Sequence, residues 1–169
     1  PAPTPPIEAR PRRISVTRVE TWLRDPYALY AKKILKLAKL DPIDMTPAAA
    51  ERGSAIHDAL DRFVKAYPVE LPPEHEAYGE LLRCGQEAFG AMMELPGVRG
   101  FWWPRYERIA RWFLGFERER RVRASEVLTE QQGRLVIDAP RGPFTLTAKA
   151  DRIERLGAEA VAILDYKTG

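Results

Sequence analysis

The spacing of apolar residues changes at about residue 123, and this change limits the folds open to the chain more than any other feature. Upstream, apolar residues recur at helical spacings, as Ile56, Leu60 and Phe63 do. Downstream, short runs typical of strands are interrupted by Gly133 and by the turn sequences PRGP and LGAE. Helices therefore come first and three or four strands follow as antiparallel hairpins, which predicts an α/β or α+β domain.

Local start signals mark the expected helices. TRVE, beginning at Thr17, is typical of a capping box that starts a short helix. Asp25-Pro26 and Thr46-Pro47 each combine an N-cap residue with a first-turn proline. Further helices are expected over residues 74–94 and after Pro104.

The chain divides into three parts on composition. Residues 1–13 are rich in proline and predict a disordered leader or linker. Residues 14–123 form the helical part, and residues 124–169 form the β-sheet core. There is no internal repeat.

Composition argues against several classes of protein. No apolar run approaches the roughly 18 residues of a membrane span, and no signal peptide opens the chain. We therefore expect a cytoplasmic protein without a membrane partner. Cys84 is the single cysteine, which excludes an internal disulfide and, by itself, a zinc site or an iron–sulfur cluster. We interpret it as a small helix residue, because nothing around it indicates an activated thiolate.

Charge is unevenly distributed, although the net charge is only +3. Residues 1–40 carry a net charge of +6 and residues 101–123 carry +4, whereas residues 41–100 carry −6. Two basic segments suit a polyanionic partner, but solvated helix faces give the same pattern. Charge alone leaves both interpretations open.

Two carboxylates, Asp151 and Asp165, lie on apolar strands on either side of the LGAE turn. Their midpoint is residue 158, inside that turn, so a hairpin closed there places them opposite one another with Cβ atoms about 5 Å apart. Like charges in this arrangement repel and invite a cation. Lys167 lies two residues beyond Asp165 and shares its face through the strand period of two.

These side chains suit metal-assisted hydrolysis of a phosphodiester. Carboxylate oxygens are the ligands that Mg²⁺ prefers, and a lysine stabilises charge on phosphate. The simpler interpretation is that D-x-K is common and that charges at strand ends solvate an edge. His57, one helical turn after Gly53, is by itself more typical of a structural or exposed histidine.

Several motifs together resemble a known family. Gly53 to His57 forms G-x-x-x-H on a helix, KADRIE contains Asp151, and ILDYKTG contains Asp165 and Lys167. This set closely resembles the nuclease domain of the RecB-type PD-(D/E)XK superfamily. TRVETWLRDPYALYAKKIL also resembles the opening helices of the nuclease domain of AddB, a subunit of bacterial AddAB helicase–nucleases. The resemblance covers residues 14–169.

The resemblance implies a restriction-endonuclease-like core that uses Mg²⁺ or Mn²⁺. Asp151, Asp165 and the backbone carbonyl of Tyr166 are then metal ligands. Lys167 is the catalytic lysine, and His57 is an additional active-site or metal-binding residue.

An auxiliary glutamate is also expected one strand before Asp151. We assign this role to Glu130 and keep Glu126 as the alternative. The two residues are four apart and could share a face, so periodicity does not decide between them.

Two departures from the family pattern matter. Asp25 stands where many relatives have the first cysteine of an iron–sulfur cluster, so we expect no cluster. The chain also ends at Gly169, before the helix that follows the lysine strand in relatives, so we expect a fragment of a larger protein that could be inactive alone. A standalone CRISPR-associated nuclease would need the missing cysteines.

Two segments are candidates for binding DNA. Lys32, Lys33 and Lys36 could follow a phosphate backbone or solvate one helix face. Trp102 and Trp103 precede Pro104 and are expected to be open enough for stacking. Arg105 adds positive charge beside these two tryptophans. The aromatic residues further along the same helix, Trp112, Phe113 and Phe116, are instead expected to lie in the core.

Our hypothesis is a metal-dependent DNA exonuclease domain of an AddB-like helicase–nuclease subunit, acting in double-strand-break repair by homologous recombination. Its expected partners are single-stranded DNA from unwound duplex ends and an AddA-like helicase–nuclease subunit. The alternative is a non-catalytic module that keeps the nuclease fold to bind DNA or a partner. The presence of all four residues Asp151, Asp165, Lys167 and His57 argues against this alternative.

Overall fold

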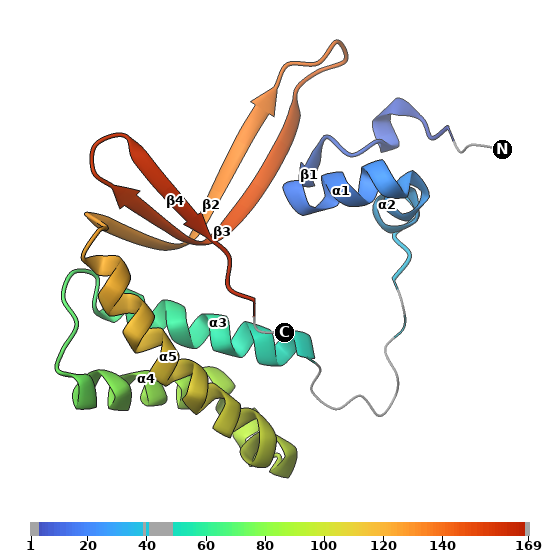
Figure 1. Ribbon diagram of the computed structural model, residues 1–169. Coiled ribbons are helices and arrows are strands. Elements are labelled where there is room, and N and C mark those ends of the chain that lie inside the picture. Colours follow the sequence, from blue (N-terminus) through green and yellow to red (C-terminus); the bar gives the residue numbers. More distant parts are fainter. Residues whose placement is uncertain (1–3, 39, 41–48, 168–169) are drawn as a thin grey trace. The chain divides into compact units, whose positions relative to one another are not determined.

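The computed structural model describes residues 4–38, 40 and 49–167, and its internal contacts divide the chain into two compact units. The first unit comprises Pro1–Ile43 and Gln132–Lys149, and the second comprises Asp44–Gln131 and Ala150–Gly169. In chain order the elements are a 3-10 turn (Ile7–Ala9), β1 (Arg13–Ser15), α1 (Val16–Arg24), α2 (Pro26–Lys33), α3 (Ala49–Ala66), α4 (Glu74–Phe89), a 3-10 turn (Gly90–Glu94), a π-helical turn (Val98–Trp102), α5 (Trp103–Arg121), β2 (Glu126–Ile137), β3 (Phe144–Leu156) and β4 (Ala160–Leu164) (Figure 1).

The described residues thus form a mixed α/β structure with a sheet of four strands and five α-helices, as the sequence predicts. The sheet order is β1-β3-β2, and β4 pairs with β3. None of the helices in the described part combines the length and apolarity that a membrane crossing requires.

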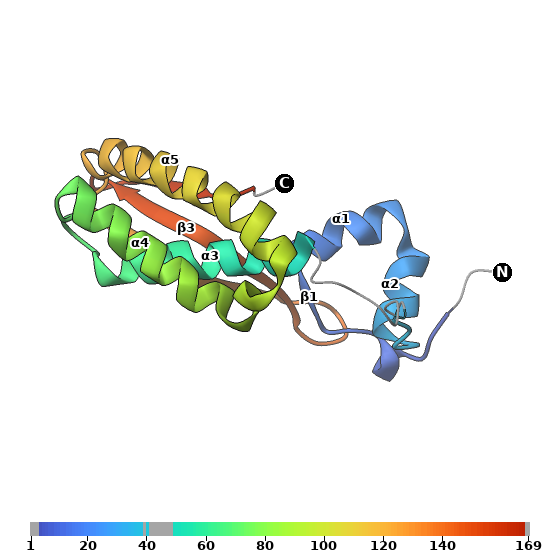
Figure 2. The same cartoon turned by 90° about the horizontal axis from the view of Figure 1, so that it is seen from below.

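The second unit is built on α3, α4 and α5, which lie side by side in Figure 2. Each helix buries one face, and Ile56, Leu81 and Phe113 are fully buried representatives of the three. Cys84 is also buried in this core, as expected of a small helix residue. Burial raises the pKa of its thiol, which makes a thiolate nucleophile unfavourable.

A close approach between α4 and α5 depends on a glycine. A Cβ atom added at Gly85 would lie 2.2 Å from the ring of Tyr106. The same ring is fully buried, and its hydroxyl donates a hydrogen bond to the carbonyl of Leu81. Only glycine therefore fits at this position of α4 with the tyrosine in place.

The β3–β4 hairpin has the register that the sequence predicts. Arg152 pairs with Leu164 and Leu156 with Ala160, so the pairing is centred on residue 158, within the turn over 157–159. Asp151 and Asp165 are the next pair in this register, although β4 itself ends at Leu164. The prediction of an antiparallel hairpin closed by the LGAE turn is confirmed, and its paired positions end one residue short of the two aspartates.

Other strand and helix predictions need correction. Gly133 does not interrupt a strand, because β2 runs through it from Glu126–Ile137. The helix expected over 74–94 ends at Phe89, since Gly90 takes a φ of +47° and a 3-10 turn follows. Before α5, residues 98–102 form a π-helical turn that no sequence signal indicated. Trp112, expected in the core, is 59% exposed.

The first unit contains β1, α1, α2 and the outer parts of β2 and β3. β1 was not expected, and it pairs in parallel with β3, with Ile14 opposite Leu146. The short helix is present, but the capping box at Thr17 is wrong, because the N-cap is Ser15, two residues earlier, and α1 begins at Val16. The Asp25-Pro26 signal is confirmed, because the Asp25 carboxylate accepts a hydrogen bond from the Ala28 amide.

Two expectations stay untested. The start signal at Thr46-Pro47 lies outside the described residues. The second is the disordered leader expected over residues 1–13, of which residues 7–9 form a single 3-10 turn ahead of β1.

Candidate metal centre

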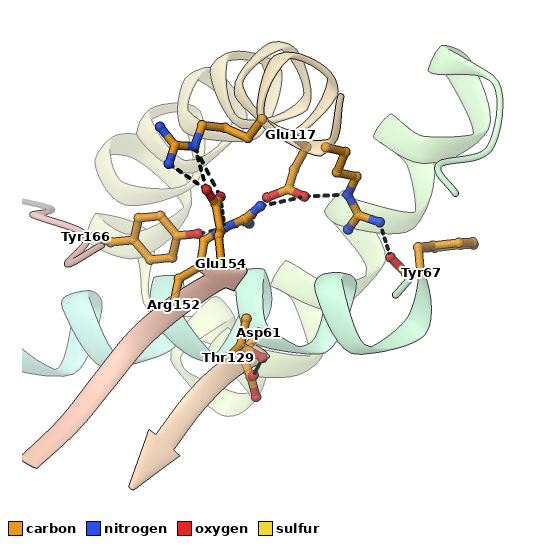
Figure 3. A network of polar contacts seen from close by, with 9 residues as sticks. Asp61, Tyr67, Glu117, Thr129, Arg152, Glu154 and Tyr166 are labelled. Atoms are coloured by element: carbon orange, nitrogen blue, oxygen red, sulfur yellow. Dashed lines mark hydrogen bonds and ion pairs between the residues drawn. The ribbon is translucent and has the colours of Figure 1, made fainter. Parts of the chain in front are cut away.

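His57 and Asp61 are one turn apart on α3 and both contact strand residues of the second unit. Thr129 of β2 donates a hydrogen bond to the Asp61 carboxylate (Figure 3). The other oxygen of that carboxylate accepts a hydrogen bond from Lys65. The Asp61 side chain is only 13% exposed and does not face solvent. This bond ties β2 to the helix that carries His57.

His57 faces the end of the β3–β4 hairpin. Its Nε2 atom lies 2.9 Å from the carbonyl oxygen of Tyr166, and its Nδ1 atom lies 3.6 Å from Oδ2 of Asp151. A carbonyl oxygen only accepts, so Nε2 carries the proton in that bond. When the ring is neutral, the Nδ1 lone pair therefore faces a carboxylate oxygen, and the two repel each other. A cation bound by both Nδ1 of His57 and Oδ2 of Asp151 would remove this repulsion.

Asp151 is held in place by the opposite arm of the hairpin. The backbone amide of Tyr166 donates a 2.8 Å hydrogen bond to Oδ2 of Asp151. The same residue therefore contacts Asp151 through its N–H and His57 through its carbonyl. The Asp151 side chain is 16% exposed and that of His57 is 25% exposed, so both remain accessible to a small ion.

Glu130 joins these two residues from β2. One ligand atom each of His57, Glu130 and Asp151 lies within 4.8 Å of the others. The backbone of Glu130 has a φ of +55°, a left-handed conformation that is uncommon outside glycine and that is often found at functional sites. Glu126, the second choice, is instead exposed and pairs with Arg155 at 3.3 Å.

Asp165 and Lys167 form an ion pair at the rim of this cluster. The Lys167 ammonium donates a hydrogen bond to the Asp165 carboxylate, and the two side chains are 83% and 60% exposed, respectively. Hydrogen bonding to Lys167 holds the pKa of Asp165 below its usual 3.8, and contact with Asp151 lowers it further. The same bond raises the pKa of Lys167, so the lysine stays protonated at neutral pH.

Behind the hairpin, a buried ionic network fixes the ring of Tyr166 (Figure 3). Arg152 and Glu154 of β3 are fully buried, and the Arg152 guanidinium contacts Glu154, Glu117 of α5 and the Tyr166 hydroxyl, the last at 3.3 Å. The Tyr166 ring also packs edge-on against Phe113. Burial raises the pKa of Tyr166 to about 12, so the hydroxyl stays protonated.

Two further arginines of α5 complete the network. Arg121 donates to Glu117 at 2.7 Å, and Arg120 donates to Glu154 at 3.0 Å. Burial alone would raise the pKa of Glu154, but the arginine hydrogen bonds outweigh it and hold the pKa below 4.5. The network was missed because charged residues in a strand pattern are read as solvent-facing. The opposite charges at the i and i+2 positions of β3 were its only sequence signal.

The donor set fits a divalent cation. Two carboxylates and one imidazole converge, and oxygen donors with a single nitrogen suit Mg²⁺ or Mn²⁺ better than soft, sulfur-seeking metals. The Tyr166 carbonyl, expected as a ligand, lies beside the cluster and accepts from His57. Asp165, also expected as a ligand, contacts Lys167 at the rim.

The residues expected to bind DNA lie in different settings. Lys32 and Lys33, in the last turn of α2, and Lys36 beyond it are exposed in the first unit. In the second unit, Trp102 and Trp103 pack partly against the helical core, so they are less open than expected. Their neighbour Arg105, in the first turn of α5, is half-buried, whereas Phe101 is 78% exposed.

Comparison with known proteins identifies relatives of this chain. A family model of the PD-(D/E)XK nuclease superfamily matches residues 13–169. An uncharacterized protein of Rickettsia bellii is 31% identical over 159 residues, and one of Rickettsia conorii is 30% identical over 161 residues. In both cases the match covers 94% of this chain and 19% of the relative, so the chain spans about a fifth of the length of these relatives. No solved structure gives a significant match.

Proposed function

Because the chain belongs to the PD-(D/E)XK nuclease superfamily, we propose that it hydrolyses phosphodiester bonds of DNA with a divalent metal ion held by Asp151, Glu130 and His57. The observation that carries this proposal is the convergence of these three side chains, from three different elements, within 4.8 Å. The fold brings residues that are far apart in sequence together here, and the bonds of Tyr166 to Asp151 and His57 hold two of them in place. Metal binding would give this convergence a function.

Each residue has a distinct role in the proposed reaction. When bound, the ion supplies Lewis acidity and lowers the pKa of a coordinated water, as divalent ions do in such sites. Asp151 and Glu130 provide the charge that holds it. The Tyr166 amide orients Asp151, and the Tyr166 carbonyl orients the His57 ring.

Lys167 is proposed to stabilise the negative charge that develops on the phosphate. Its ammonium is exposed and protonated, and it lies beside Asp165, so it can reach a substrate strand at the rim of the cluster. A preorganised cation at this position acts where charge develops. Asp165 holds the lysine in place and follows directly after the last paired position of the hairpin, where it can add a further oxygen ligand.

We further propose that the domain is an exonuclease of an AddB-like helicase–nuclease subunit that acts in recombinational repair. The sequence resemblance of the opening helices supports this assignment. The greater length of the relatives is compatible with it, since a helicase region would need many residues outside the matched part. Neither metal nor lysine reads bases, so cleavage is expected to be independent of sequence.

The proposal is tested by release of nucleotides from end-labelled single-stranded DNA in Mg²⁺ or Mn²⁺. The wild type should degrade the strand, and Lys167→Ala should slow degradation by about 100-fold or more. Because the Lys167 side chain is 83% exposed, this variant should unfold at the wild-type temperature. DNA binding without degradation in the wild type would instead indicate a non-catalytic binding module.

Two glutamates of β2 provide a matched comparison for the site itself. Glu130→Gln removes a charge from the cluster, whereas Glu126→Gln removes one from an exposed pair with Arg155. Activity should fall sharply in the first variant and stay at the wild-type level in the second. Equal effects of the two substitutions would refute the assignment of Glu130.

A further inference from the structure

We propose that the first unit binds single-stranded nucleic acid in a pocket lined by residues of β1, α1, α2 and the tip of the β2–β3 hairpin. The pocket has a volume of about 760 Å³, within the range of sites that enclose small organic groups. It lies within one unit and contains none of the residues of the metal centre. Binding there can therefore be measured separately from hydrolysis.

Four aromatic side chains line the pocket, namely Trp22, Tyr27, Tyr30 and Phe144. Trp22 and Tyr27 line it and are 46% and 60% exposed, respectively, so large ring surfaces are open to solvent. Trp22 lies beside Phe144, with ring centroids 6.4 Å apart, and Tyr27 lies beside Tyr30 at 5.9 Å. Neither pair is stacked face to face, since the rings are tilted by 38° and 37°. Exposed ring faces of this kind accept the bases of a single strand.

Arginines surround these rings. Arg10, Arg12, Arg24 and Arg141 line the same pocket, and all four are exposed. Asp25 is the one acid among its described lining residues, and its carboxylate already caps α2. Guanidinium groups bind phosphate through two parallel hydrogen bonds and also stack on flat rings, so arginine suits both parts of a nucleotide.

The charge of the whole unit favours the same ligand. The first unit contains 12 basic and 5 acidic residues, a net charge of +7, whereas the second contains 15 and 19, a net charge of −4. The net positive charge of the protein therefore comes from the unit with the aromatic pocket. A polyanion is therefore attracted more strongly to this unit than to the acidic one.

Two other occupants fit the pocket less well. An apolar peptide segment would match the rings but would bury arginines without anionic partners, which is unfavourable. Duplex DNA keeps its bases stacked inside the helix, where aromatic walls cannot reach them. A single strand offers both unstacked bases and phosphates, and it is also the product of unwinding that the proposed nuclease would receive.

The test is binding of a fluorescently labelled oligothymidine to the protein in EDTA, measured by anisotropy. EDTA prevents metal-dependent cleavage, so a failure of this inference is distinguishable from a failure of the proposed nuclease activity. Trp22→Ala should weaken binding by about 5- to 150-fold, the range expected for loss of one base–aromatic stack. Trp22→Phe keeps an aromatic face and should retain most of the affinity.

Trp112 provides a matched control, because it is a tryptophan of the second unit that is also exposed, at 59% against 46% for Trp22. Trp112→Ala should leave the affinity within about twofold of the wild type, since no loss of stacking is expected there. Arg141→Ala should reduce the slope of log affinity against log salt by about 0.7, the value for one phosphate contact on a single strand. Unchanged binding in Trp22→Ala, equal losses in Trp22→Ala and Trp112→Ala, or no binding by the wild type would overturn the inference.

Discussion

Replacing Arg152 by Met is expected to destabilise the protein strongly, because it removes the central cation of a buried network. The guanidinium is fully buried and lies 2.6 Å from Glu154, and it also pairs with Glu117 and contacts the Tyr166 hydroxyl. Breaking a buried ion pair from one side leaves uncompensated charge and typically lowers the free energy of unfolding by about 3–5 kcal/mol.

The remaining contacts place the expected loss within that range. Glu117 keeps Arg121 at 2.7 Å, and Glu154 keeps Arg120 at 3.0 Å, so neither carboxylate is left without a cation. We therefore expect a loss near the lower end, about 3 kcal/mol. For a chain of this size, that corresponds to a fall in melting temperature of about 6–12 °C.

Urea and thermal unfolding of the variant measure this loss, and Arg155→Met is the matched control. Arg155 lies on the same strand, but its side chain is 61% exposed and pairs with Glu126 at 3.3 Å on the surface. An exposed pair contributes about 0–1 kcal/mol, so the control should unfold close to the wild type. A loss below about 1 kcal/mol for Arg152→Met, or equal losses in both variants, would refute the reasoning.

Two further predictions concern stability. Gly85→Ala should destabilise the protein by about 1–3 kcal/mol through overpacking against Tyr106. Gly79→Ala, in the same helix with no atom near the added Cβ, should instead stabilise the protein by about 0.5–1 kcal/mol. Thermal melts of both variants test this prediction, and a Gly85→Ala variant as stable as the wild type would contradict the packing. Acid should also weaken the fold, because the pKa of Glu154 lies below 4.5 in the folded state. The ionised Glu154 carboxylate therefore contributes its full stabilisation of the fold above about pH 4.5, and this contribution is lost as the pH falls through the folded pKa. Urea unfolding at a series of pH values measures this, and stability that stays constant down to pH 2 would contradict it.

The parts of the site that local patterns control could be predicted from the sequence. The turn at residues 157–159 determines the hairpin register, and that register pairs Arg152 with Leu164, the residues next to Asp151 and Asp165. The strand period likewise predicts that Lys167 and Asp165 lie on one side, where they form an ion pair. The spacing of Glu126 and Glu130 could not separate them. What distinguishes them is the backbone conformation at Glu130 and the position of α3, both of which depend on tertiary packing.

Other features depend on contacts between elements far apart in the chain. The approach of His57 to the Tyr166 carbonyl joins residues 109 positions apart, and no local pattern encodes it. Arg152 and Glu154 look like solvent-facing residues because their partners, such as Glu117, lie on a separate helix. The three-residue strand β1 is too short for a periodic signal, since its pairing with β3 comes from the fold.

The central claim is that Asp151, Glu130 and His57 hold a divalent ion, and binding of Mn²⁺ measured by electron paramagnetic resonance tests it most directly. The wild type should bind Mn²⁺ at a saturable site that Asp151→Asn removes, whereas Glu126→Gln should bind as the wild type does. Thermal unfolding without metal would show that Asp151→Asn remains folded. Identical Mn²⁺ binding in all three proteins, or no saturable binding in the wild type, would contradict the claim.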